Sequence, residues 1–104
     1  MKGVYSLSRS AQRDIEDIRS YTLARYGQEQ VETYLGGLRR HFEFIAKFPG
    51  IGRPVPASAL RTSPFEHHRT FYREAPEGIR IERILHERQD LVAEIQLLID
   101  RSGR

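Results

Sequence analysis

Basic, aromatic and imidazole side chains concentrate in residues 67–90, which read HHRTFYREAPEGIRIERILHERQD. Cleavage of RNA without a metal needs a general base, a general acid and cations that stabilise the charged transition state. Arg69, Arg83 and His86 supply suitable residue types, and histidine changes its charge near neutral pH. On one regular strand, however, positions 83 and 86 point to opposite faces unless a bulge intervenes. A ribonuclease face, a docking surface for a protein partner and a solvated sheet are therefore three open alternatives.

No other spacing indicates a bound metal, a cofactor or covalent catalysis. The chain has no cysteine, which excludes thiolate ligands and disulfides. His67 and His68 are adjacent, and adjacent strand residues point to opposite faces, so the pair does not suit one metal ion. The GIGRP segment at residues 50–54 favours a turn over a phosphate-binding loop because a proline, not a helix, follows its glycines. We therefore expect no metal and no cofactor, and we favour no set of catalytic residues.

Length and charge bound the class of protein. A chain of 104 residues, 38% hydrophobic and 30% charged, predicts one globular domain over residues 1–104 with a modest core. Its formal net charge of +3 permits, without requiring, attraction to nucleic acid or to an acidic protein. No apolar run approaches the roughly 20 residues of a transmembrane helix, and no export signal is recognisable. We expect a cytoplasmic protein that does not contact the membrane.

The elements that must position these residues begin with a strand at residues 4–7 and two helices. Ser8 or Ser10 offers an N-cap oxygen for the first helix, which is expected to end at Gly27. Its apolar stripe consists of Ala11, Ile15 and Ile18. The second helix carries a longer stripe at helical spacing, formed by Val31, Leu35, Leu38, Phe42 and Ile45. The Gly36-Gly37 pair inside it predicts close approach to the first helix, with a local kink as the alternative.

The second half predicts three strands and a short helix after a Gly- and Pro-rich loop at residues 50–58. The strands are expected at residues 60–62, 68–73 and 78–86, with a hairpin turn at residues 75–78. Alternation along the last strand places Ile79, Ile81, Arg83 and Leu85 on one face. The chain is thus predicted to be α+β: an N-terminal strand, an antiparallel helix hairpin, a three-strand antiparallel meander and a short C-terminal helix. We expect the helices on one face of the sheet and the first strand at an edge or beside the last strand.

Several short motifs resemble those of ParE-type toxins in the RelE/ParE superfamily. The first half contributes Ser8 with Ala11, Asp14 and Ile15, then F-x-x-IA-x-FP at residues 42–49 and GRP at residues 52–54. The second half contributes HR-x-FY at residues 68–72 and GI-x-I-x-RILH at residues 78–86, followed by Arg88 and Asp90. The motifs span almost the whole chain, from Val4 to about Ile95, and the RILH and FYR pieces favour the ParE branch.

The resemblance implies the toxin component of a type II toxin–antitoxin module, a ParE-like inhibitor of DNA gyrase neutralised by a ParD-like antitoxin. Such a toxin needs no active site of its own and no sequence-specific nucleic-acid contact, and it forms a hetero-oligomer with its antitoxin. A RelE-like ribosome-dependent mRNA endoribonuclease is the alternative, and an inactive relative that only binds antitoxin is a third. RelE-type cleavage uses lysines, arginines and a late tyrosine, whereas the only lysines here are Lys2 and Lys47 and no tyrosine follows Tyr72. If the chain were a ribonuclease, Arg69, Arg83 and His86 would be its catalytic residues.

Two sets of partner contacts are predicted on the same basis. The candidate gyrase contacts are Arg53, Arg61, Arg69, Arg83, His86 and Arg104. An antitoxin is expected to lay an amphipathic segment against the helix hairpin, with its carboxylates meeting toxin arginines. The candidate antitoxin contacts lie outside the main apolar stripes and are Tyr21, Tyr34 and Phe44. Ordinary core or singly exposed aromatic residues are the alternative for that second set.

Overall fold

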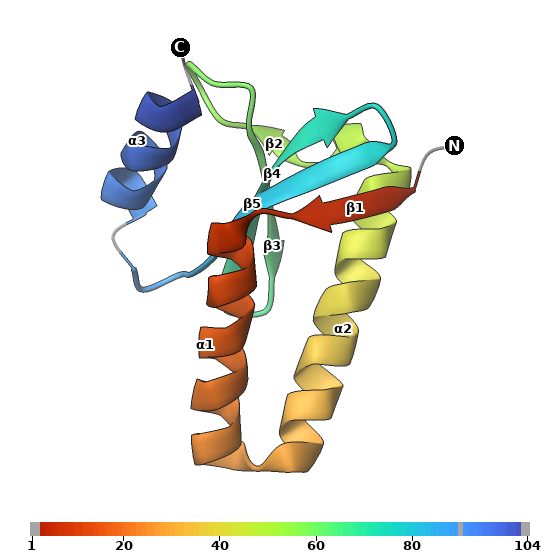
Figure 1. Ribbon diagram of the computed structural model, residues 1–104, viewed down its shortest axis with the longest axis vertical. Helices are drawn as coiled ribbons and strands as arrows, with labels where there is room; N and C mark the ends of the chain where they lie inside the picture. The colour runs from red at the N-terminus through yellow and green to blue at the C-terminus, as the bar shows by residue number, and fades with distance from the viewer. Residues whose placement is uncertain (1–2, 90, 103–104) are drawn as a thin grey trace.

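The computed structural model describes residues 3–89 and 91–102 and contains three helices and a five-stranded sheet in that part of the chain (Figure 1). Their order is β1 (Val4–Leu7), α1 (Arg9–Tyr26), α2 (Gln28–Lys47), a short 3-10 turn η1 (Pro49–Ile51), β2 (Arg53–Pro54), β3 (Arg61–Phe65), β4 (His68–Ala75), β5 (Gly78–His86) and α3 (Leu91–Ser102). No helix among the described residues is long and apolar enough to cross a membrane.

The sheet confirms the predicted α+β class. Its strand order is β1-β5-β4-β3-β2, and β3, β4 and β5 form the predicted antiparallel meander. Strand β1 lies parallel to β5 at the edge of the sheet, as expected for a first strand placed beside the last. The two-residue strand β2 lies within the segment that was predicted to be only a loop, and it pairs with β3 at the other edge.

The prediction that all helices lie on one face of the sheet is wrong. The helices α1 and α2 cover one face, where Leu38, Phe42 and Tyr72 share a core cluster. The opposite face carries Phe71 and Leu85 in a second cluster with Leu98 of α3. Phe71 and Tyr72 are neighbours and are both buried, which requires cover on both faces of β4 because adjacent strand residues point to opposite sides.

A β-bulge in β5 changes which residues share a face. Phe71 pairs with Arg83 whereas Tyr72 pairs with Ile81, so β5 carries one extra residue, Glu82, at this point. Ile81 and Ile84 consequently pack in the α1–α2 cluster. The predicted face of Ile79, Ile81, Arg83 and Leu85 is therefore wrong beyond Ile81, because a bulge inverts the alternation that follows it.

The ends of the helices agree with the sequence, whereas the role of the glycine pair does not. Ser8 is the N-cap of α1, and its Oγ accepts a hydrogen bond from Ala11 N at 3.0 Å. Gly27 ends α1 with φ 91°, a conformation that favours glycine. Helix α2 runs unbroken past the glycine pair. A Cβ on Gly37 would lie 3.0 Å from the ring of Phe65 in β3, so the close approach is to the sheet and not, as predicted, to α1.

Candidate functional site

The helices α1 and α2 project beyond the end of the sheet (Figure 1). A groove of about 1290 Å³, called the hairpin groove below, is lined by these two helices and by the strands that face them. One wall is formed by the distal halves of the two helices, and the other by the turn between β3 and β4 and by the end of β5. The residues that matter for its chemistry are Tyr21, Arg25, Tyr34, Arg40, His67, His68, His86, Glu87 and Arg88.

Tyr34 and His68 form the most tightly coupled polar pair in the groove. The Tyr34 hydroxyl lies 2.6 Å from Nδ1 of His68, which joins the middle of α2 to the start of β4. Burial raises the pKa of Tyr34 to about 12. Burial and the neighbouring imidazoles of His86 and His67 lower the pKa of His68 to about 4. At neutral pH the tyrosine therefore keeps its proton and the imidazole is neutral, and we assign the hydroxyl as the donor and Nδ1 of His68 as the acceptor.

His67 and His86 lie next to this pair. The ring of His86 is edge-on to that of His68 at 5.1 Å between centroids and is stacked near His67 at 6.4 Å. Nδ1 of His67 lies 3.0 Å from Oε2 of Glu87, and this hydrogen bond lowers the pKa of the Glu87 carboxyl. The backbone amide of Arg88 donates to Nδ1 of His86 at 3.0 Å. The three imidazoles therefore form one cluster where β4 begins and β5 ends.

Arg83 is held by carboxylates from two helices. Its Nε and Nη2 donate to Asp14 of α1 at 2.8 and 3.1 Å, and its Nη1 donates to Glu94 of α3 at 2.9 Å. The same Asp14 carboxylate accepts a hydrogen bond from the amide of Ile84 at 2.8 Å. These bonds, led by that to Asp14, raise the pKa of the guanidinium. Arg83 thus fastens both helices to the bulge in β5 and has little capacity left for a phosphate.

The structure does not bring the three candidate ribonuclease residues together. Arg69 pairs with Leu85 across the sheet, shares its face with Phe71, and donates to Thr62 at 3.1 Å. His86 lies beyond the bulge on the opposite, hairpin face. Arg83 is already paired to two carboxylates, so Arg69, Arg83 and His86 do not surround one point at which a substrate could react.

The other candidate gyrase contacts are scattered. Arg53 is exposed on the edge strand β2. Arg61 donates to the carbonyl of Gly52 at 2.8 Å and pairs with Glu74 at 3.7 Å, so much of its capacity is used within the fold. Arg104 lies outside the described residues.

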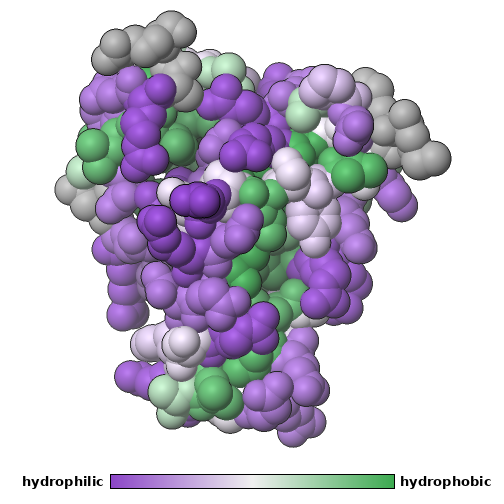
Figure 2. Space-filling view, viewed as in Figure 1, coloured by the Kyte–Doolittle hydropathy of each residue, from purple (hydrophilic) through white to green (hydrophobic). Residues whose placement is uncertain are grey.

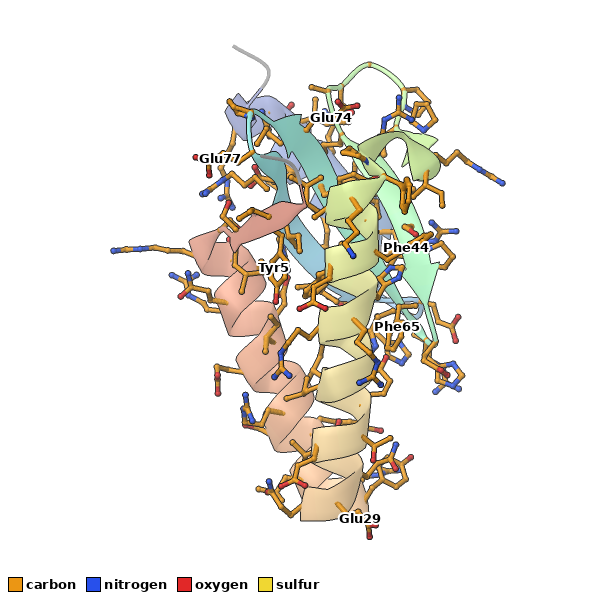
Figure 3. All side chains as sticks on the ribbon, turned by 90° about the vertical axis from the view of Figure 1, so that its right-hand side faces the viewer. Tyr5, Glu29, Phe44, Phe65, Glu74 and Glu77 are labelled. Atoms are coloured by element: carbon orange, nitrogen blue, oxygen red, sulfur yellow. The ribbon has the colours of Figure 1, made fainter. Side chains whose placement is uncertain are left out.

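Two of the three candidate antitoxin contacts meet in the hairpin groove. Tyr21, which is 57% exposed, and Tyr34 both line it, and the guanidinium of Arg25 lies over the Tyr21 ring at 5.4 Å. Phe44 lies elsewhere, 47% exposed and packed against Phe48 at 5.2 Å. Figure 3 shows Phe44 nearer the C-terminal end of α2 than Phe65, which lies beside the middle of the helix.

His67, His68 and Tyr26 also line the groove, although no pattern in the sequence predicted this. Their convergence depends on the β3–β4 turn folding back toward α2, and no local spacing reveals that long-range contact. The one usable signal was the pair of adjacent histidines at the start of a strand, because one of them had to face the helices.

The chain is a small α+β protein with a groove between its helix hairpin and its sheet, and comparison with known proteins assigns its family. A family model described as the ParE toxin of the type II toxin–antitoxin system parDE matches residues 5–91. Toxin ParE1 of Caulobacter vibrioides is 38% identical over 87 residues, which cover 80% of this chain and 88% of the relative. Toxin ParE1 of Mycobacterium tuberculosis is 36% identical over 94 residues, which cover 88% of this chain and 96% of the relative.

The fold has a counterpart among solved structures. A chain of the chromosomal ParDE TA system from P. aeruginosa superposes with a TM-score of 0.70 at 21% identity, covering 79% of this chain and 92% of that one. The chain described here belongs to the ParE toxin family of type II toxin–antitoxin systems.

Proposed function

We propose that this chain inhibits DNA gyrase in the cytoplasm and that a ParD-like antitoxin neutralises it. The observation that carries the proposal is the family match over residues 5–91, together with relatives named Toxin ParE1 that align over at least 88% of their own length. A gyrase inhibitor needs no catalytic centre of its own, since the target enzyme performs the DNA chemistry.

The separation of Arg69 from His86 supports inhibition by binding over RNA cleavage. General acid–base catalysis requires the acting groups within hydrogen-bond reach of the same substrate atoms. Here the two side chains lie on opposite faces of the sheet, and Arg83 is bound by Asp14 and Glu94.

The exposed aromatic groups of the hairpin support the antitoxin part of the proposal. Tyr21 and Tyr26 are 57% and 63% exposed, and both line the groove with Tyr34. Exposed aromatic residues around a concave surface are typical of sites that receive an amphipathic segment. On the face seen in Figure 2, hydrophobic residues also form a continuous seam between α1 and α2.

A supercoiling assay tests the first part directly. The purified full-length chain is incubated with gyrase, relaxed plasmid DNA and ATP, with and without the protein encoded by the adjacent reading frame. We expect loss of supercoiling or accumulation of cleaved DNA, and reversal of either effect by the adjacent protein. Normal supercoiling together with codon-positioned cuts in ribosome-bound mRNA would contradict the proposal and favour the RelE-like alternative.

Two arginine variants refine the assay. Arg53 is exposed at the edge of the sheet and Arg13 is exposed on α1. If the candidate gyrase contacts are correct, Arg53→Ala weakens inhibition whereas the matched charge loss in Arg13→Ala does not. Equal effects of the two variants would remove Arg53 from the interface and leave only general electrostatic attraction.

A further inference from the structure

The hydrogen bonds around the histidine cluster fix which ring nitrogens can bind a ligand. Nδ1 of His68 accepts from the protonated Tyr34 hydroxyl, at 2.6 Å, so the neutral ring carries its proton on Nε2. Nδ1 of His86 accepts from the amide of Arg88 at 3.0 Å, which assigns the same tautomer to that ring. In the described part of the chain, neither Nε2 has a hydrogen-bond partner or belongs to the buried unpaired atoms. The groove therefore holds two oriented N–H donors with nothing to donate to.

The charges around these donors nearly cancel. Asp14 and Arg83 are paired with each other. The remaining charged groups that line the groove are Asp17, Arg25, Arg40, Glu66, Glu87 and Arg88. Three arginines thus oppose three carboxylates, so the groove carries little net charge. Burial keeps His68 neutral, with a pKa of about 4.

Two oriented donors in a nearly neutral groove suit one anionic group and not a polyanion. A nucleic-acid strand would bring a row of phosphates past Asp17, Glu66 and Glu87, which would repel it. A metal ion is also a poor fit, because the described residues contain no group of three His, Cys, Asp or Glu side chains placed to hold one. A peptide can present a single carboxylate within an otherwise apolar segment, and such a segment matches the exposed tyrosines Tyr21 and Tyr26 beside the donors.

We propose that His68 and His86 bind the carboxylate of one aspartate or glutamate of the antitoxin through their Nε2–H groups. The inference rests on the proposed function, since it assigns a chemical anchor to the antitoxin expected in the same groove.

The test uses the full-length toxin and the protein encoded by the adjacent reading frame. Their affinity is measured by calorimetry at neutral pH. His86→Ala should weaken binding about 10-fold, the loss expected for one hydrogen bond to a charged group. His86→Gln keeps a side-chain N–H donor, so it should retain more of the affinity than His86→Ala.

His41 provides the matched control. It lies on α2, packs against Phe65 at 5.3 Å between ring centroids and is absent from the lining of the groove, so His41→Gln should leave the affinity unchanged. On the other side of the interface, each antitoxin carboxylate is replaced in turn by its amide. One replacement should weaken binding to wild-type toxin and have no further effect on His86→Ala, because the two groups contribute to one interaction.

Each outcome decides the matter. A complex that forms with unchanged affinity in His86→Ala overturns the inference and leaves the proposed function intact. Absence of any complex with wild-type toxin overturns the antitoxin part of the proposed function and the inference with it. His86-dependent binding of single-stranded RNA, with an antitoxin interaction insensitive to His86, replaces the carboxylate by a phosphate and also overturns the inference. Circular dichroism melting curves establish that each variant is folded.

Discussion

Substitution of Asp14 by alanine should be the most damaging single change of a charged residue among the groups that join the helices to the sheet. The Asp14 carboxylate accepts three hydrogen bonds, two from the Arg83 guanidinium and one from the amide of Ile84. The last residue of β1 that pairs with β5 is Leu7, which lies opposite Ile81. Strand β1 therefore offers no backbone partner to the amide of Ile84, which lies beyond the bulge. Alanine would leave the amide unpaired and would leave Glu94 as the remaining carboxylate on Arg83.

The size of the loss follows from the exposure of these groups. The side chains of Arg83 and Asp14 are 18% and 12% exposed, so the pair is mostly, but not fully, removed from water. A hydrogen bond to a charged group contributes about 1.5–3 kcal/mol, and an unsatisfied buried amide costs about 1–3 kcal/mol. Water that enters the partly exposed site offsets some of this, so Asp14→Ala should lower the free energy of unfolding by about 3 kcal/mol. For a chain of this length the melting temperature should fall by roughly 12–24 °C.

Urea denaturation of the isolated chain, followed by circular dichroism, measures the effect against two controls. Asp17 is one turn further along α1, is exposed, and has no hydrogen bond or ion pair among the described residues. Asp17→Ala should change stability by less than about 0.5 kcal/mol. Glu94 is 34% exposed and makes a single bond to Arg83, so Glu94→Ala should cost about 1 kcal/mol. The reasoning is refuted if Asp14→Ala is no worse than Asp17→Ala, or if Glu94→Ala costs more than Asp14→Ala.

Three further predictions concern the core and the groove. Gly36→Ala should raise the free energy of unfolding by about 0.5–1 kcal/mol, because alanine favours the helix and the new methyl would meet only a flexible side chain at 3.6 Å. Gly37→Ala should raise it less, because its methyl would lie 3.0 Å from an aromatic ring. Urea denaturation of the two variants measures this difference. Tyr72→Phe removes a hydroxyl that accepts a hydrogen bond at 2.9 Å and donates one at 2.8 Å, so stability should fall by about 1–3 kcal/mol, and equal denaturation midpoints would contradict this. Burial lowers the pKa of His68 in the folded chain from 6.5 to about 4. Between these pH values the unfolded chain binds more protons than the folded chain, so stability should decline as the pH falls through them. His68→Gln should remove that part of the decline, which denaturation at a series of pH values measures.

The sequence predicted those parts of the fold that depend on local periodicity. The apolar stripe from Val31 to Ile45 predicted α2, and the capping residues Ser8 and Gly27 predicted the ends of α1. Strand propensity together with turn residues predicted β4 and β5. These signals act within one element, where the spacing of apolar residues and the conformational preferences of caps and turns are legible. The predicted order of elements followed from them.

The parts that failed depend on contacts between elements. The bulge at Glu82 leaves no mark in strand propensity, so the strict alternation assumed for β5 placed Arg83 and Leu85 on the wrong face. The position of α3 on the second face was readable in principle from the adjacent apolar residues Phe71 and Tyr72, but a one-sided sheet was assumed. The bond between Tyr34 and His68 joins residues 34 positions apart, and no local pattern contains that distance.

One inserted residue in β5 decides which faces of the sheet Arg83 and His86 occupy and thereby shapes the chemistry of the groove. Without the bulge, Ile84 and His86 would face α3, and Arg83 would face the hairpin. With it, Ile84 completes the core under α1 and α2, and Arg83 reaches carboxylates on two helices. His86 turns toward His68 and Tyr34 at the groove. The basic residues of β4 and β5 are thereby divided, because Arg83 joins two helices to the sheet whereas His86 lines the groove.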